Sequence, residues 1–254
     1  MTDLSLRILK TVIRTYPQVI PYLRGRARFA AAMLRPEGFK TYEYFLQQLE
    51  GLIRGVYDGN VGGEFIDVTA NLISGQLNQA FQQAWQDEGM TDELMPDYLT
   101  SAAEDMILGQ YDFVDQLYRD IADARNDHLF NLHNPYLPPI EEVSLNSLLA
   151  RAALWARRWT EAYNLGVQLI VRELGGKLEW IEGDTVEKCF ICVSLNGIVA
   201  FAREWDELGV RPQNAPNPAL AEGCGGWRCA CELRPTDKRR SPKAFDTILN
   251  LTTR

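Results

Sequence analysis

All five cysteines of this chain lie after residue 188, in two short groups. Cys189 and Cys192 form a C-x2-C pair, and after an interval of 31 residues Cys224, Cys229 and Cys231 follow with the spacing C-x4-C-x-C. Two tight turns that each aim thiolates at one point supply the ligands of tetrahedral zinc. The spacing therefore predicts a structural zinc site. Its preferred ligands are Cys189, Cys192, Cys224 and Cys229.

Five thiols exceed the four positions of such a site. We expect Cys229 and Cys231, which lie two residues apart, to point to opposite faces of a strand, so that only one binds the metal ion. Cys231 is then the uncertain ligand. Zinc would also contribute folding free energy to a module too small to be stable through apolar burial alone.

Other interpretations of the cysteines stay open. They could be small core residues, or they could form disulfides once outside a reducing cell. A redox C-x2-C would need a thioredoxin-like βαβ context, which the sequence does not indicate. A catalytic zinc would need an open position with a histidine or carboxylate nearby. The two histidines, His128 and His133, lie well upstream, and we interpret them as surface or cap residues.

Motifs for other chemistry are missing from the sequence. It contains no G-x-x-x-x-G-K-[ST], no G-x-S-x-G and no H-E-x-x-H, and no Ser/His/Asp or Cys/His arrangement can be argued. We therefore expect a protein that is not an enzyme, with no small-molecule substrate.

The elements that must position the cysteines follow from hydrophobic periodicity. Apolar residues at spacings of three and four predict a series of helices. These cover about 3–15, 21–34, 38–56, 65–84, 97–126 and 144–174. After Gly176 the short runs KLEWI, GIVAF and CACEL predict strands, separated by turn residues. The segment 206–223 is rich in Pro and Asn and predicts a long loop.

The expected fold class is α+β, a mainly α-helical body with a small C-terminal β-rich cysteine module. We divide the chain into a helical N-terminal region, a helix with the β/cysteine module, and a basic C-terminal tail. The corresponding ranges are 1–140, 141–235 and 236–254. Trp180, Trp205 and Trp227 are expected to anchor the core of the β module.

Charge is distributed unevenly along the chain. The net charge is −8, but residues 1–36 carry +6 and residues 234–254 carry +4, which leaves −18 for residues 37–233. Basic ends on an acidic body suggest arms that dock on an acidic partner, although a solvated helix face and a ragged tail would look the same. The acidic body argues against a broad nucleic-acid-binding surface.

We expect neither a membrane protein nor a secreted one. No stretch of about 18 uncharged apolar residues is present, and Arg7, Lys10 and Arg14 interrupt the N-terminal apolar run where a secretory signal would need continuity. The expected compartment of synthesis is a reducing cytoplasm, where clustered cysteines favour metal over disulfide.

Residues 151–235 carry a series of motifs in a definite order. ARRWTEAYNLGVQ is followed by LEWI, by CFICVSLNGIVAF, by a Pro-rich loop and by GWRCACELRP. This series resembles the C-terminal region of phage minor head proteins, the Mu F-like or phage head morphogenesis family. The helical stretch from 51 to 85 is also similar to a hairpin in many of these proteins.

The chain departs from the family at one point. Many members have His-Pro shortly before the last C-x-C, whereas this chain has GCGGWRCAC, so that Cys224 would replace the histidine. Arg151, Arg158 and Asn164 match family-like positions on the helix. We interpret these three as a solvated face or an intradomain salt bridge.

The resemblance implies a structural role. Such proteins are low-copy components of the virion head or neck, made in the host cytoplasm, associated with the portal and required for assembly. The implied partners are the portal protein, the major capsid protein or both, and packaged DNA through the basic ends. The alternatives are an intracellular zinc-module enzyme or toxin-like effector of prophage origin, and a cellular zinc-dependent adaptor.

Overall fold

The computed structural model describes most of the chain after residue 41. The described ranges are 42–90, 94–156, 158–183, 189–213, 218–220 and 229–252. The expected helices over 3–15 and 21–34 lie outside the described residues, as do Cys224 and Trp227.

The chain divides into two compact units, and each is described by itself. Unit 1 contains residues 1–75 and 110–148, and unit 2 contains residues 76–109 and 149–254. These boundaries differ from the predicted ones at 140 and 235. The units follow packing rather than sequence order, because the long helix α4 (Glu64–Asp87) contributes residues to both.

Unit 1 is helical. It contains α3 (Tyr42–Tyr57), the first half of α4, α6 (Tyr111–His133) and the start of α7 (Leu145–Ala156). Helix α3 packs on α6, and the ring of Phe65 stacks on Tyr118 with 5.7 Å between centroids. The fully buried apolar residues include Leu49, Ile53, Phe65, Leu117 and Ile121. They recur at three- and four-residue spacings, which is why this stretch forms packed helices.

Two of the expected long helices are each divided into two shorter helices. Instead of one helix over 97–126, α5 (Asp97–Leu108) ends with Gly109 as its C-cap, and α6 begins at Tyr111. Glycine is among the residues least favourable to a helix interior, which accounts for a break there. The expected helix over 144–174 is described as α7 and α8 (Arg158–Glu173). No helix in the described ranges has both the length and the apolar character to cross a membrane.

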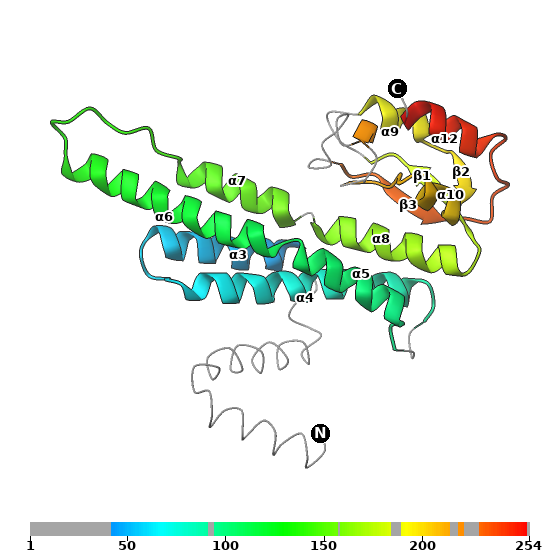
Figure 1. Ribbon diagram of the computed structural model, residues 1–254, viewed down its shortest axis with the longest axis horizontal. Coiled ribbons are helices and arrows are strands. Elements are labelled where there is room, and N and C mark those ends of the chain that lie inside the picture. Colours follow the sequence, from blue (N-terminus) through cyan, green and yellow to red (C-terminus); the bar gives the residue numbers. More distant parts are fainter. Residues whose placement is uncertain are drawn as a thin grey trace, which may run out of the picture. The chain divides into compact units, whose positions relative to one another are not determined.

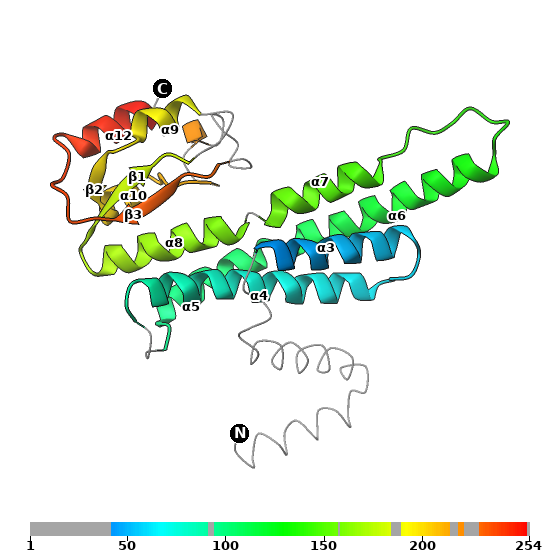
Figure 2. The same cartoon turned by 180° about the vertical axis from the view of Figure 1, so that it is seen from behind.

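The sheet of unit 2 has three antiparallel strands in the order β2-β1-β3. They are β1 (Lys177–Ile181), β2 (Val199–Phe201) and β3 (Glu232–Pro235). Helix α8 covers one face of this sheet, while α9 (Phe190–Leu195) and α12 (Ala244–Thr252) lie on the other (Figures 1 and 2). The helical body with a small sheet confirms the expected α+β class.

Two tryptophans form the core of this module, as predicted. Trp180 and Trp205 are fully buried, with ring centroids 5.7 Å apart. Trp205 belongs to the short helix α10 (Ala202–Glu207), and its indole N–H donates to the carbonyl of Leu178 at 3.3 Å. Of the three expected strands, KLEWI is β1 and GIVAF contains β2, but only the last two residues of CACEL belong to β3.

The basic C-terminal segment folds back on the module. Lys238 donates to Glu179 at 2.7 Å, and Arg240 forms an ion pair with Glu204. Helix α12 then packs against α9 and β2. Two of the charges of the predicted basic tail are therefore engaged within unit 2.

Candidate metal centre

Three thiols converge in unit 2. The Sγ atoms of Cys192, Cys229 and Cys231 all lie within 4.8 Å of one another. In a tetrahedral zinc–thiolate site with Zn–S bonds of about 2.3 Å, the sulfurs are about 3.8 Å apart. Small side-chain rotations would therefore bring the three thiols to metal-ligand spacing. Cys192 and Cys231 are buried and Cys229 is half-buried, so the cluster is largely removed from water.

The expectation that Cys229 and Cys231 face opposite ways is wrong. In an extended chain, adjacent side chains alternate between faces, and residues two apart share one face. The segment lies just before β3, which begins only at Glu232. Both of its thiols approach Cys192, so Cys231 belongs to the cluster of three.

The other two predicted ligands, Cys189 and Cys224, are not part of this group of three thiols in the described structure. Cys189 is half-buried at the N-cap of α9, and the structure does not bring its thiol into the group of three. Cys224 lies outside the described residues. The predicted ligands Cys192 and Cys229 are thus brought together, and Cys231 joins them.

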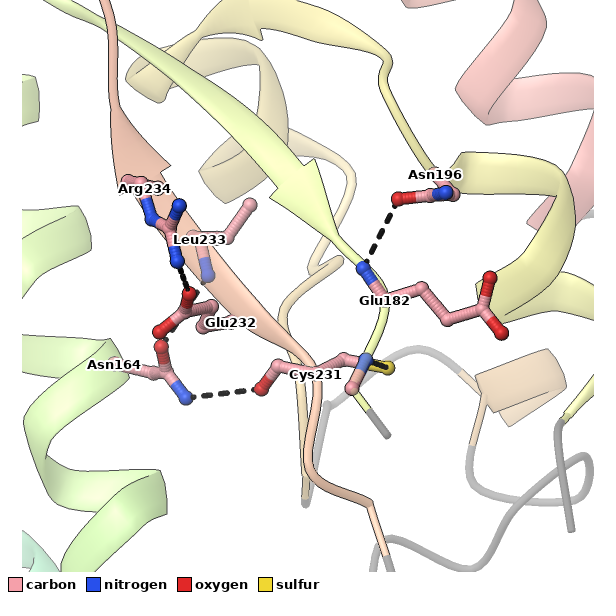
Figure 3. A network of polar contacts seen from close by, with 8 residues as sticks. Asn164, Glu182, Asn196, Cys231, Glu232, Leu233 and Arg234 are labelled. Carbon is pink, nitrogen blue, oxygen red and sulfur yellow. Dashed lines mark hydrogen bonds and ion pairs between the residues drawn. The ribbon is translucent and has the colours of Figure 1, made fainter. Parts of the chain in front are cut away.

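Helix α9 presents Cys192 to the cluster. Its buried residues are Cys192 and Leu195, whereas Phe190 is largely exposed. The helix ends at Leu195, and the side-chain oxygen of its C-cap residue Asn196 accepts a hydrogen bond from the backbone N–H of Glu182 at 3.0 Å (Figure 3). Gly197 follows with a φ of 79°, a conformation that glycine adopts without strain. This turn returns the chain to the sheet and explains the L-x-G that follows C-x2-C.

A buried pair of amides holds the segment that carries Cys229 and Cys231. Asn164 of α8 donates to the side-chain oxygen of Gln213 at 2.8 Å and to the carbonyl of Cys231 at 3.4 Å. Its own oxygen accepts from the backbone N–H of Leu233 at 3.3 Å. Figure 3 shows this side chain pointing from the helix to the cysteine segment. Asn164 is fully buried, so the expectation of a solvated helix face is wrong for this residue.

Gln213 completes the pair. Its amide nitrogen donates to the carbonyls of Cys229 at 3.2 Å and Cys231 at 2.9 Å. The two side chains together can donate four hydrogen bonds, and all four are made, three of them to cysteine carbonyls. Gln213 was not among the candidate residues, because nothing in its loop sequence distinguishes it.

Gly183, two residues after the end of β1, also contacts the cysteine segment. The backbone N–H of Gly183 points to the Sγ of Cys231 at 3.5 Å. A Cβ atom at Gly183 would lie 2.2 Å from the carbonyl oxygen of Ala230, so only glycine fits there. The close approach keeps the cysteine segment against the sheet.

Charged residues on α8 lie beside this network. Arg158 forms an ion pair with Glu161, which is buried, and this agrees with an intradomain salt bridge at Arg158. Burial lowers the pKa of Arg211, and the negative charges of Glu161 and Asp206 partly offset this effect. Arg151 is half-buried on α7.

The two histidines belong to unit 1 and have local partners. His128 Nδ1 lies 3.2 Å from Glu142, and His133 Nδ1 lies 2.7 Å from the carbonyl oxygen of Leu129 in the last turn of α6. These positions agree with the interpretation of both as surface or cap residues.

Comparisons with known proteins add no relative to this picture. No family model matches the chain, and no curated protein or solved structure is significantly similar to it.

Proposed function

We propose that this chain is a structural virion protein, a minor head or portal-associated component that acts in phage head assembly. The observation that carries the proposal is that the motifs of residues 151–235, on which the resemblance rests, pack against one another. The helix motif, the strand with Trp180 and three of the cysteines, Cys192, Cys229 and Cys231, pack as one module, and Asn164 joins the helix to the last C-x-C. Motifs that recur in a fixed order are expected to form one structural unit.

In this proposal the cysteines hold zinc. Thiolates are soft ligands, and a site built from them favours zinc over magnesium or calcium. Cys192, Cys229 and Cys231 would supply three positions, and Cys189 or Cys224 the fourth. Zinc stabilises the module by binding thiolates that the unfolded chain does not hold together. Its role is structural, and the protein is not an enzyme.

An exposed apolar segment in unit 1 supports a role in protein–protein contact. It lies between α6 and α7, where Tyr136 is 98% exposed and Leu137 is 52% exposed. The segment is shaped by Asn131, whose side chain donates to the carbonyl of Ile140 and accepts from its N–H, both at 2.8 Å. Exposed apolar side chains on an ordered connection are typical of binding surfaces. The proposed partner is the portal or the major capsid protein.

The test is incorporation into particles. The chain would be tagged in its own genome, and particles from the lysate would be separated on a density gradient and probed for the tag. We expect a low copy number in assembled heads. The double variant Tyr136→Ser, Leu137→Ser should fold normally and enter heads less often, and Leu94→Ser, which alters another exposed leucine, is its control.

Absence from every particle fraction would contradict the proposal. If the chain also stayed with the soluble proteins and slowed host growth when expressed alone, the result would favour the toxin-like effector.

A further inference from the structure

Side-chain amides, not a neighbouring strand, hold residues 229–231. The pairing of β1 with β3 begins at Ile181 and Glu232, so the cysteine segment lies beyond the ladder. The carbonyls of Cys229 and Cys231 accept hydrogen bonds from Gln213 instead, and Asn164 adds a second bond to Cys231. The direction of these two carbonyls is therefore set from α8 and the 210–213 loop.

We propose that the Asn164–Gln213 amide pair positions the thiolates of the metal site, an inference that rests on the zinc assignment above. The carbonyls of Cys229 and Cys231 lie two residues apart in an extended segment. When both are held by hydrogen bonds, the segment cannot rotate about its long axis. That rotation decides whether the thiols of Cys229 and Cys231 face Cys192. The amides touch no sulfur in this arrangement, so they are positioning residues and not ligands.

The pair is built as a closed unit. Asn164 is fully buried and Gln213 is 4% exposed, so neither amide can exchange its partners for water. Gln213 adopts a φ of 63°, which residues with a Cβ atom rarely do. The bond from Asn164 to its side-chain oxygen and the two bonds to the cysteine carbonyls hold it in that conformation.

The test compares zinc affinity in variants of the full chain. Removing a residue that orients a metal ligand usually weakens metal binding about 10- to 100-fold. We expect this loss for Asn164→Ala, measured by competition with a chromophoric zinc chelator under reducing conditions. With cobalt in place of zinc, the thiolate–metal absorption should weaken and shift, because the sulfurs no longer converge.

Gln168→Ala is the matched control. Gln168 lies on the same helix four residues later and is 2% exposed, but it makes no hydrogen bond to residues 229–231 in the described part of the chain. Its loss should lower the stability of the protein without changing zinc affinity or the cobalt spectrum. A purely structural role of Asn164 would instead make the two variants alike.

Each outcome decides the proposal. Wild-type zinc affinity and cobalt absorption in Asn164→Ala would overturn it, and so would an equal loss in Gln168→Ala. If Asn164→Ala does not fold, Gln213→Ala removes two bonds to the cysteine carbonyls from the loop side and gives the same test. If the wild-type chain binds no zinc, the zinc assignment and this proposal fail together, whereas incorporation into heads is decided separately.

Discussion

Gly183 lies where the chain leaving β1 passes the cysteine segment. A Cβ atom there would stand 2.2 Å from the carbonyl oxygen of Ala230, well inside contact distance. The N–H of the same residue points to the Sγ of Cys231 at 3.5 Å, where it can donate a hydrogen bond to the sulfur. One backbone position thus affects both the packing and the chemistry of the cluster.

Gly183→Ala should therefore disturb stability and metal binding together. We expect the free energy of unfolding to fall by about 1–3 kcal/mol, because a methyl group must displace backbone. Zinc affinity should fall as well, since Ala230 lies between two of the thiols. Urea unfolding and chelator competition would measure the two effects.

Gly63→Ala is the control, since a Cβ atom at Gly63 meets nothing within 4 Å. It should change stability by no more than about 0.5 kcal/mol. If Gly183→Ala behaved like Gly63→Ala in both measurements, the close approach would have no energetic consequence.

At this scale the residue types were predictable and their surroundings were not. Cysteine spacing indicated a metal site. The convergence of Cys229 and Cys231 follows from the two-residue period of an extended segment, in which residues two apart share one face, whereas the prediction placed them on opposite faces. Asn164 is buried in a polar row with Glu161 and Gln168, and apolar periodicity does not reveal such a row. The role of Gln213 could not be predicted, because its left-handed backbone conformation is one that Gly or Asn usually adopts.

Helix α10 is tied to the segment between β3 and α12. Glu204, in its first turn, accepts hydrogen bonds from the N–H of Phe201 and from the Nε of Arg240, both at 2.9 Å. Next to Arg240, Ser241 exchanges two hydrogen bonds with Val199 of β2, at 2.9 and 3.0 Å. The hydrogen bond from Arg240 and the capping bond from Phe201 hold the pKa of Glu204 below its ordinary value, against the effect of burial.

Arg240→Ala should therefore reduce stability in a pH-dependent way. A carboxylate whose pKa is lowered by folding contributes stability above its unfolded pKa, and the contribution is lost as pH falls through the folded pKa. We expect a loss of about 1 kcal/mol at neutral pH, since Arg240 is partly exposed. The difference from wild type should shrink below about pH 4. Urea unfolding at several pH values would measure it.

Arg239→Ala removes the neighbouring charge, which is exposed and has no ion pair among the described residues. Both variants would lose metal alike in acid, so their comparison isolates Glu204. Equal and pH-independent losses in the two variants would contradict a specific pairing of Arg240.

The elements were predictable in proportion to their length. The long helices follow a clear 3.6-residue period, whereas α9 and α10 have six residues each, too few to show one. The division between α5 and α6 depends on one glycine, Gly109, and a pattern of apolar residues runs through it. Strand β3 starts three residues after Cys229 because its partner β1 ends at Ile181.

The whole molecule carries most of its acidic charge between two basic ends. The C-terminal end is partly neutralised within unit 2 by the pairs that Lys238 and Arg240 form. Residues 1–36 carry a charge of +6 and lie outside the described residues, so for them the docking arm stays a hypothesis. An acidic partner surface, such as packaged DNA or an acidic face of the portal, would attract them.

Deleting residues 1–16 should lower incorporation of the chain into heads. Replacing Arg7, Lys10 and Arg14 together by Gln removes three positive charges but retains the apolar residues. The comparison with the deletion separates the contribution of charge from that of the apolar residues. We expect the triple variant to lose part of the incorporation and the deletion to lose more. Unchanged incorporation of the deletion variant, measured on gradient-purified particles, would remove the N-terminal segment from the proposal.

The most direct test of the central claim is the metal content of the full chain purified under reducing conditions. Elemental and native mass spectrometry should find about one zinc per wild-type chain, and little or none in Cys192→Ser and Cys231→Ser. Cys189→Ser and Cys224→Ser, measured alongside, identify the fourth ligand. A wild-type chain without metal, or Cys231→Ser with full zinc occupancy, would contradict a metal centre built on these three cysteines.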